Sequence, residues 1–299
     1  MMDTNRCFSF SRLAMVMKRD LMENGKKTLY GFLGICTLFL AMYLLMMATD
    51  YRSLSGYINA HTSAFGVISA FYLTYAASEM MRNLRTKEAR LSYLMLPATP
   101  LEKFASRAIF VTVGVMLMIF AALLMAEALH WLFIPLFEDF PEEYKTWVLP
   151  EVWERTWESI NPFQTRTIYL NAIEGTDPST WQRVERNYFL IVSMGYAATL
   201  WQHSIFVLGG NYFRKHPLIK TLAFMFLIGS LMGWMITAFD WDTLSRIAHS
   251  LEPFLKGLDE NTVAGCISVV FLAFTALNWW LSYKLFTRRQ VIEPKFRLP

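Results

Sequence analysis

LYGFLGICTLFLAMYLLMMA, residues 29–48, is a run of twenty residues without a charged side chain. A helix rises 1.5 Å per residue, so about 20 residues cross the roughly 30 Å hydrocarbon core of a bilayer. Five more apolar runs of at least this length follow Leu29–Ala48 along the chain: Ala60–Met81, Ala108–Phe137, Tyr188–Gly210, Leu218–Phe239 and Val263–Phe286. Only helices and closed barrels satisfy their backbone groups in lipid, and these runs lack strand-like alternation. The sequence therefore predicts an all-α, polytopic membrane protein with six transmembrane helices in a single transmembrane domain, residues 1–299.

The composition supports a membrane protein. Of the 299 residues, 55% are hydrophobic and 17% are charged, whereas about 25% are charged in an ordinary soluble domain. The three cysteines are scattered and have no metal-ligand spacing, so the sequence indicates neither a disulfide framework nor a metal site. The basic residues flank the apolar runs, as they do in membrane proteins generally, and no nucleic-acid partner is expected.

The distribution of positive charge predicts the orientation. Of the 28 Lys and Arg residues, 20 lie in residues 1–28, 82–107, 211–220 and 284–299, and the other eight lie in the alternate loops. Cytoplasmic loops collect Lys and Arg. We therefore expect both termini in the cytoplasm and the segment 138–187 outside. The first apolar run is a full span without a cleavage site, so it is not a removable signal.

An amphipathic segment precedes the first span. Its apolar residues recur at helical spacing, and Arg12, Arg19 and Glu23 fall on the opposite side. Gly25 follows and predicts the end of a short helix. Such a helix lies flat at the cytoplasmic lipid interface. It is either a simple anchor or an elbow that couples a cytoplasmic partner to the first span. The predicted lipid-facing residues are Phe10, Leu13, Met17 and Leu21.

The cytoplasmic loop 82–107, RNLRTKEARLSYLMLPATPLEKFASR, has an apolar centre. A short helix is expected over Thr86–Met95, stopped by Pro97 and Pro100, after which the chain restarts as a helix leading into the third span. Apolar side chains exposed to the cytosol gain by burial against a partner. The alternative is that these side chains dip into lipid or pack under the helix bundle.

An N-terminal amphipathic helix, two spans and a loop reading LSYLMLPATPLEKFASR resemble the permease subunits of ABC-2-type exporters of the bacterial cytoplasmic (inner) membrane. A second stretch, LGGNYFRKHPLIKTL (Leu208–Leu222), is similar to the connection between spans four and five in such permeases. The resemblance implies that two six-span chains pair as a homo- or heterodimer. It also implies that a coupling helix docks on a separate ATP-binding subunit. The residues that correspond to this docking segment are Arg90, Leu91, Tyr93, Leu94, Met95, Leu96 and Pro97.

The chain has no GxxxxGK[ST] loop and no cytoplasmic stretch long enough for a nucleotide-binding domain. We therefore expect no ATPase activity and no cofactor in this chain, and we expect any ATP hydrolysis in the partner subunit. A non-transporting membrane scaffold or assembly factor would have the same topology. An intramembrane enzyme would need several polar groups that converge at one depth, and the spans show no such pattern.

Two motifs lie inside the spans. Gly229 and Gly233 form a GxxxG step in the fifth span, where small residues let another helix approach closely. The partner is either a second permease chain or a helix of the same bundle. Glu127 and His130 share one face of the third span. A di-metal bundle site needs this Glu-x-x-His motif twice, and the sequence has no second copy, so a metal or proton role is not favoured.

The outer segment 138–187 contains ten acidic and five basic residues. Pro150 is expected to open a helix with Val152, Trp153 and Trp157 on one side. This outer helical insert either caps the bundle or forms a lid or docking surface over an exit pathway. It is longer than the corresponding loop of small ABC-2 permeases, which is a departure from the family's pattern.

Overall fold

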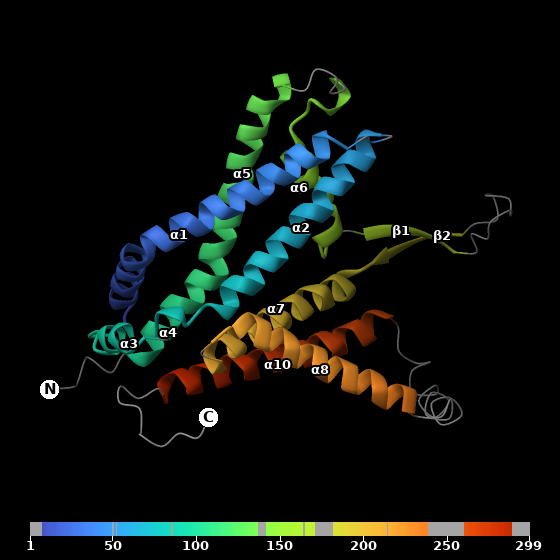
Figure 1. Ribbon diagram of the computed structural model, residues 1–299. Coiled ribbons are helices and arrows are strands. Elements are labelled where there is room, and N and C mark those ends of the chain that lie inside the picture. The colour runs from blue at the N-terminus through green and yellow to red at the C-terminus, as the bar shows by residue number, and fades with distance from the viewer. Residues whose placement is uncertain are drawn as a thin grey trace. The chain divides into compact units, whose positions relative to one another are not determined.

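The computed structural model describes residues 8–49, 51, 53–84, 86–136, 142–163, 165–170, 182–213, 215–238 and 260–288. The chain divides into two compact units. The first unit comprises residues 1–155, 203–222 and 278–299, and the second comprises residues 156–202 and 223–277. Helices account for nearly all of the described secondary structure (Figure 1).

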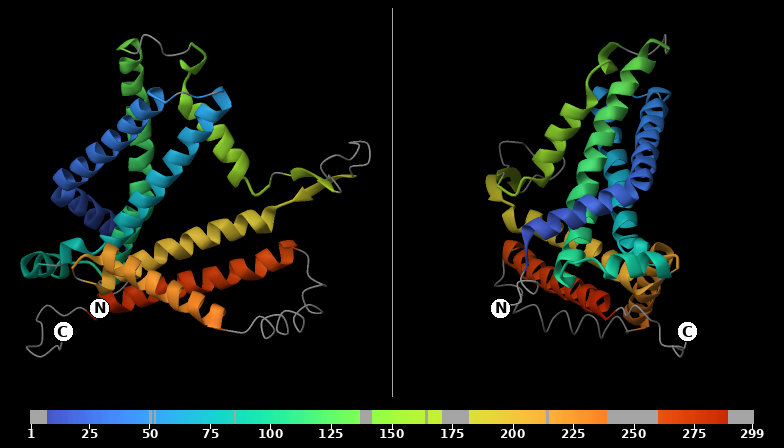
Figure 2. Two further views of the ribbon diagram at one scale, coloured as in Figure 1. Left: turned by 45° about the vertical axis from the view of Figure 1, so that its right-hand side comes forward. Right: turned by 90° about the vertical axis from the view of Figure 1, so that its left-hand side faces the viewer.

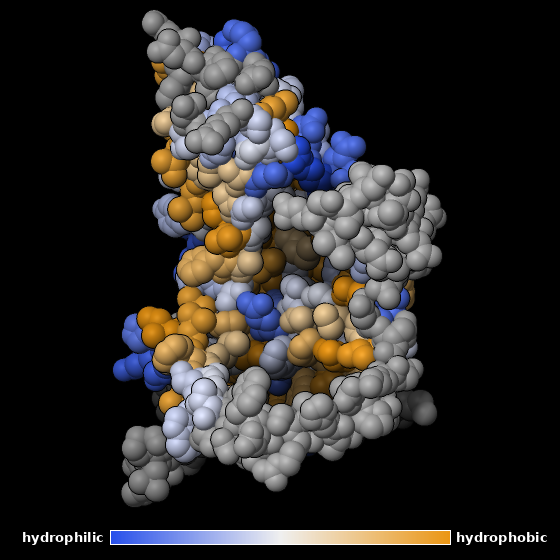
Figure 3. All heavy atoms as spheres, turned by 90° about the vertical axis from the view of Figure 1, so that its right-hand side faces the viewer, coloured by the Kyte–Doolittle hydropathy of each residue, from blue (hydrophilic) through white to orange (hydrophobic). Residues whose placement is uncertain are grey.

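Five described helical segments have the length and hydropathy needed to cross a membrane. They are Phe10–Met47, Pro100–Leu136, Phe189–Tyr212, Pro217–Trp234 and Asn261–Thr287. Large apolar side chains are exposed along them, for example Leu117, which is 64% exposed, and Phe226, which is 77% exposed. Apolar residues also cover part of the surface shown in Figure 3. Exposed apolar surface on this scale needs lipid or protein to cover it, so the prediction of a multi-pass α-helical membrane protein is confirmed.

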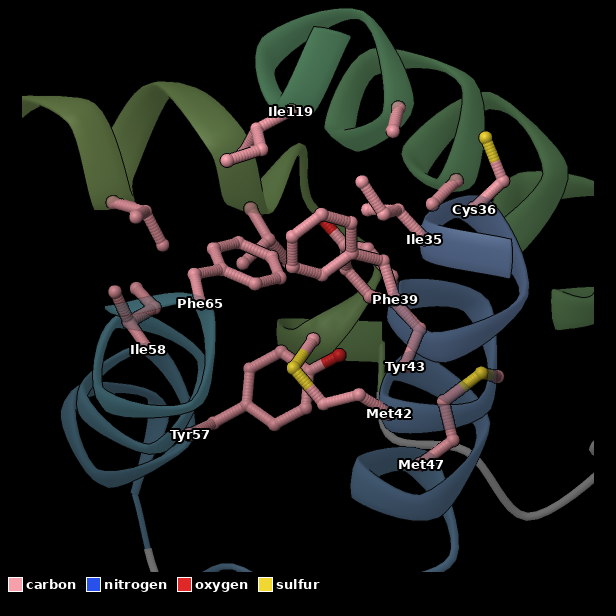
Figure 4. Close-up of a cluster of buried hydrophobic side chains, with 14 of the residues drawn as sticks. Ile35, Cys36, Phe39, Met42, Tyr43, Met47, Tyr57, Ile58, Phe65 and Ile119 are labelled. Carbon is pink, nitrogen blue, oxygen red and sulfur yellow. The ribbon is translucent and has the colours of Figure 1, made fainter. Parts of the chain in front are cut away.

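The core of the first unit lies between α1 (Phe10–Met47), α2 (Leu54–Ser78) and α5 (Val115–Phe133). Phe39 and Tyr43 of α1 are fully buried against Phe65 of α2, with ring centroids 5.6 and 5.5 Å from it. Figure 4 shows these rings pointing toward one another, with Ile119 of α5 above them. Helices α1 and α2 therefore pack against each other, and α5 covers them.

Helix α1 is continuous through Gly25, so the predicted end of a separate short helix at that residue is wrong. Glycine inside a helix costs only about 1 kcal/mol relative to alanine, and long helical segments on both sides offset this cost. Asn24 also bonds back through Nδ2 to the carbonyl oxygen of Asp20, at 2.9 Å, within the same helix. Figure 2 shows that the N-terminal part of α1, in dark blue, runs at an angle to the remainder.

The loop 82–107 forms the two predicted helices. A single 3₁₀ turn at Arg82–Leu84 leads to α3 (Lys87–Leu94), and α4 (Pro100–Ile109) begins at the second of the two prolines. A π-helical turn, η3 (Phe110–Gly114), joins α4 to α5. The helix expected over Thr86–Met95 is thus confirmed in place and length.

The described residues of segment 138–187, the predicted outer insert, form a 3₁₀ turn (Glu142–Tyr144), one α-helix and one pair of strands. Helix α6 (Val148–Ile160) begins two residues before Pro150. Val152 is buried, whereas Trp153 and Trp157 are 60% and 51% exposed, so the three residues do not share one environment. Strands β1 (Thr165–Leu170) and β2 (Gln182–Asn187) pair antiparallel, with Ile168 opposite Val184. This hairpin is an addition to the helical insert that we expected, and short charged strands of this kind carry a weak sequence signal.

The remaining helices are α7 (Phe189–Tyr212), α8 (Pro217–Ala238) and α10 (Glu260–Thr287). In the second unit, Trp201 of α7 stacks on Phe271 of α10 with ring centroids 5.1 Å apart. In the first unit, Asn278 Nδ2 of α10 donates to Ser204 Oγ of α7 at 2.9 Å. Apolar stacking and an interhelical hydrogen bond thus join α7 to α10 along their lengths.

Gly209 and Gly210 at the end of α7 allow close helix packing in the first unit. A Cβ atom on Gly210 would overlap the backbone carbonyl of Ser78 at the end of α2, and one on Gly209 would overlap the Thr221 side chain of α8. His216, between α7 and α8, has a φ of 50° immediately before Pro217. Gly209 and Gly210 therefore let α2 and α8 approach α7 closely.

Candidate functional site

The short helices of the loop 82–107 are defined by their caps. Thr86 Oγ1 accepts from Ala89 N at 3.4 Å and starts α3. Thr99 and Glu102 form a capping box at the start of α4, with Glu102 N donating to Thr99 Oγ1 at 3.2 Å and Thr99 N donating to Glu102 Oε2 at 2.8 Å. Pro100 occupies the first turn of α4, where no backbone donor is needed. Local sequence alone therefore fixes where both helices begin.

Glu102 also joins α4 to the start of α1. Its Oε1 atom accepts from Ser9 N at 2.6 Å and from Arg12 Nη2 at 2.9 Å, and its side chain is fully buried. One carboxylate thus satisfies backbone donors at the N-termini of two helices and forms an ion pair with Arg12. Charge-assisted hydrogen bonds of this kind are about twice as strong as neutral ones, so the two helix ends are held together firmly.

A second buried ion pair, between Asp20 and Arg107, also links α1 to α4. Arg107 Nη2 donates to Asp20 Oδ1 at 3.1 Å, and both side chains are 10% exposed. Ser106 Oγ donates to the other oxygen of Asp20, also at 3.1 Å. The Asp20 carboxylate is therefore bound through both oxygens, and α1 and α4 are connected at two points.

Tyr93 ties α3 into the same network. Its hydroxyl donates to the carbonyl oxygen of Lys103 at 2.7 Å and accepts from Arg107 Nε at 3.4 Å. The Arg107 guanidinium also lies 4.7 Å from the centre of the Tyr93 ring. Burial raises the pKa of Tyr93 to about 12, so the phenol stays protonated and remains a donor near neutral pH. A further bond, from Arg19 Nη2 to Ser92 Oγ at 2.6 Å, connects α1 directly to α3.

We call this set of contacts the cytoplasmic joint, after the side of the membrane that the charge distribution predicts for it, and it consists of Arg12, Asp20, Tyr93, Glu102 and Arg107. Each of its ion pairs is largely buried, and removal of one partner would leave the other charge uncompensated. A displacement of α3 would be transmitted through Tyr93 and Arg107 to α4, and through Asp20 to α1. The joint can therefore couple a force on the loop to the helices that enter the membrane.

The predicted docking residues divide between this joint and the surface. Met95 is 78% exposed and Pro97 is exposed, whereas Leu91 and Leu96 are half-buried. The side chain of Leu94 lies outside the described part of the chain. Two of the seven predicted residues, Arg90 and Tyr93, are buried, at 8% and 2% exposed. For Tyr93 the alternative of packing under the bundle is correct, because its hydroxyl finds an acceptor on α4.

The predicted interfacial stripe is also only partly exposed. Phe10 and Leu21 are 79% and 53% exposed, Met17 is half-buried and Leu13 is buried. The face that contacts α3 and α4 is the one with Arg12 and Arg19, which the hydrophobic pattern assigned to solvent. Ion pairing to buried acceptors explains the difference. It leaves Phe10 and Leu21 exposed.

Gly229 and Gly233 lie on an exposed face of α8. A Cβ atom on either glycine would have no described atom within 4 Å of it. The described residues of the second unit therefore leave the GxxxG face uncovered.

Sequence reasoning missed a buried polar cluster formed by α1, α2, α5 and α6. The fully buried Glu127 carboxylate accepts from Tyr43 OH at 2.6 Å, and from the backbone nitrogens of Val148 and Leu149 at 2.6 and 3.0 Å. Val148 and Leu149 open α6, so Glu127 caps that helix from a neighbouring one, where a negative charge is stabilised. The expectation that the spans bring no polar groups together is therefore wrong.

Two buried histidines complete this cluster. The His130 ring stacks on Tyr43 with centroids 4.7 Å apart, and His61 donates from Nδ1 to the carbonyl oxygen of Tyr57 at 3.0 Å. Neither ring nitrogen of His130 has a hydrogen-bond partner among the described residues, nor has Nε2 of His61. No group of three His, Cys, Asp or Glu residues suited to a metal ion occurs among the described residues. The contacts of Glu127 with the described residues attach the start of α6 to α5, which is a structural role.

No family model matches the chain, and no curated protein or solved structure shows significant similarity to it.

Proposed function

We propose that this chain is the membrane-spanning permease subunit of an ABC-2-like exporter, and that a separate ATP-binding subunit drives it. The observation that carries the proposal is the cytoplasmic joint. A short helix, α3, is followed by the exposed residues Met95 and Pro97. It is connected by buried hydrogen bonds to α4 and by an exposed hydrogen bond to α1. A docked partner that moved this helix would move the entries of two membrane helices together.

The topology in this proposal has six spans, with α2 as the second. Helix α2 has 25 residues and no Asp, Glu, Lys or Arg, although Asn59 and His61 make it less apolar than the five other candidates. A helix of that length is about 37 Å long, which is enough to cross a bilayer. The Lys and Arg distribution favours cytoplasmic termini in a bacterial inner membrane.

A second permease chain would complete the assembly. The uncovered face of Gly229 and Gly233 supports such a contact, because small residues allow close approach of two helices in lipid, where packing rather than hydrophobicity drives association.

The test is binding of an ATP-binding subunit encoded by a neighbouring gene. The two proteins are co-expressed, and the complex is purified through this chain. Met95→Glu places a charge in the docking surface and should lower recovery of the ATP-binding subunit about tenfold. Leu136→Glu is the matched control. Leu136 is 72% exposed, similar to Met95, and it lies at the opposite end of the helical segment Pro100–Leu136 from the loop 82–107.

Three outcomes would count against the proposal. Equal recovery of the ATP-binding subunit with both variants would show that Met95 does not lie in the docking surface. ATP-independent transport by the chain alone in vesicles would show that no ATP-binding subunit drives it. A stable complex whose ATPase activity is insensitive to this chain would instead favour a scaffold, because a driven permease alters the turnover of its ATPase.

A further inference from the structure

A cavity of about 490 Å³ lies in the first unit, between α1, α2 and the segment formed by α4, η3 and α5. This volume falls within the range of about 300–1,000 Å³ that is typical of small-molecule sites. Five charged residues line the cavity: Asp20, Lys27, Glu79, Arg82 and Arg107. It borders the cytoplasmic joint through Asp20 and Arg107 but extends well beyond it.

The lining changes from charged to apolar along the helices. Arg107 lies at the end of the cavity near the loop 82–107, and Val111, Val115 and Met118 follow at successive turns of the same segment. At 1.5 Å per residue, Arg107 and Met118 are about 16 Å apart along the axis. On α2 the order is the same, with Glu79 at the loop end and Tyr72 further in. The cavity therefore has one polar end and one apolar end.

Two backbone features lie in the wall of the cavity. The π-helical turn η3 contributes Phe110 and Val111 to the lining, and π turns inside α-helices are frequent at functional sites. Gly31 of α1 faces Tyr72 of α2, where a Cβ atom would lie 2.7 Å from the tyrosine hydroxyl. The glycine thus lets the tyrosine sit against the α1 backbone, at the apolar end of the space.

The charged side chains that line the cavity differ in how closely they are ion-paired. Arg107 is held by Asp20 at 3.1 Å in the cytoplasmic joint. The Arg82 side chain is 41% exposed, and its Nε atom lies 3.9 Å from Glu79 Oε2, which is a long distance for an ion pair. Lys27 is exposed, and no ion pair of Lys27 is found among the described residues. The lining therefore holds three basic and two acidic side chains, with Lys27 outside the ion pairs found among the described residues and Arg82 only loosely paired, and an anion is the complementary ligand.

We propose that this cavity binds one phospholipid from the leaflet next to the loop 82–107. Lys27 and Arg82 bind the phosphate, and the first part of an acyl chain lies along Val111, Val115 and Met118. The rest of the lipid remains in the bilayer. Basic pockets between membrane helices on the cytoplasmic side are suited to lipid headgroups, and the apolar end distinguishes this cavity from a site for a soluble anion.

The test uses the purified full chain alone in detergent, so it needs no ATP-binding subunit. Binding of phosphatidylglycerol is measured by native mass spectrometry and compared with two probes. Diacylglycerol has the chains without the phosphate, and glycerol 3-phosphate has the phosphate without the chains. We expect phosphatidylglycerol to bind at least about tenfold more tightly than either probe, because only it fills both ends of the cavity.

Two pairs of variants locate the site. Lys27→Gln should weaken phosphatidylglycerol binding about tenfold, whereas Lys26→Gln, on the neighbouring residue outside the lining, should not. Met118→Trp should fill the apolar end and block binding, whereas Met116→Trp, at a position 60% exposed on the same helix, should leave it intact. Lys27 is a surface residue, so its variant tests the proposal even if Met118→Trp fails to fold.

Equal losses from Lys26→Gln and Lys27→Gln would overturn the proposal in favour of general surface attraction. Equally tight binding of diacylglycerol would exclude phosphate recognition, and equally tight glycerol 3-phosphate would exclude a lipid site. None of these results bears on the docking of an ATP-binding subunit at Met95, so failure of one proposal leaves the other standing.

Discussion

Asp20 and Arg107 are 87 residues apart in the chain, yet their side chains meet at 3.1 Å with only 10% of each exposed. The Glu102 carboxylate likewise accepts hydrogen bonds from Ser9 and Arg12, which are 93 and 90 residues away in the chain. At this scale the joint depends on a few charges that satisfy one another where water is largely excluded. Such pairs contribute specificity more than net stability, because desolvation offsets their attraction.

The Asp20–Arg107 pair can be tested by removing one charge. Asp20→Asn leaves Arg107 without its counter-ion and should lower the free energy of unfolding by about 3 kcal/mol. Glu23→Gln is the matched control, because it removes a negative charge from the same helix where the ion pair to Arg19 is exposed. We expect the control to cost less than about 0.5 kcal/mol. Chemical unfolding in detergent measures both, and equal effects would show that the buried pair is not structurally important.

Among the elements, α7 shows how small residues set helix spacing. Gly210 lies against the Ser78 carbonyl at the end of α2, whereas Gly195, on the same helix, has open space around it. Gly195 stands alone in the apolar run and Gly210 follows Gly209, but the sequence does not show which of the two faces another backbone. Their surroundings differ because only Gly210 faces another backbone.

The difference predicts opposite effects of the same substitution. Gly210→Ala should destabilise the protein by about 1–3 kcal/mol, because the new methyl group overlaps backbone that cannot rotate away. Gly195→Ala should stabilise it by about 0.5–1 kcal/mol through helix propensity alone. Thermal unfolding of the two variants in one detergent is the measurement. A similar shift in midpoint for both would contradict the close packing of α7 on α2.

For the whole molecule, the proposed topology places α3 and α6 on opposite sides of the membrane. The argument rests on charge, since 20 of 28 Lys and Arg residues fall in the segments assigned to the cytoplasm. The membrane-spanning helices themselves do not report their direction.

Single cysteines test this orientation. Cys7, Cys36 and Cys266 are first replaced by alanine, and one cysteine is then introduced at Glu151 or at Met95, which are both exposed. In intact cells freed of their outer membrane, an impermeant maleimide should label Glu151→Cys at once and Met95→Cys only after lysis. The reverse pattern would invert the topology and place the proposed docking surface outside the cell.

The membrane class, the approximate ends of most apolar helices, and the short helix between Thr86 and Met95 were predictable from the sequence. These features are local, because the length of an apolar run, a capping threonine and a proline act within a few residues of one another. The continuity of α1 through Gly25 was not predictable, since the cost of a helical glycine is small and the flanking segments decide.

Only the tertiary structure decided four features: the burial of Tyr93, the charged contact face of α1, the Glu127 cap on α6, and the cavity between α1, α2 and the α4–α5 segment. Each depends on groups that are far apart in the chain, such as Tyr43 and Glu127, which are 84 residues apart and joined at 2.6 Å. A buried polar residue and an exposed one have the same hydropathy in the sequence. Which of them finds a partner is settled when the helices pack, because an unpartnered polar group is costly to bury.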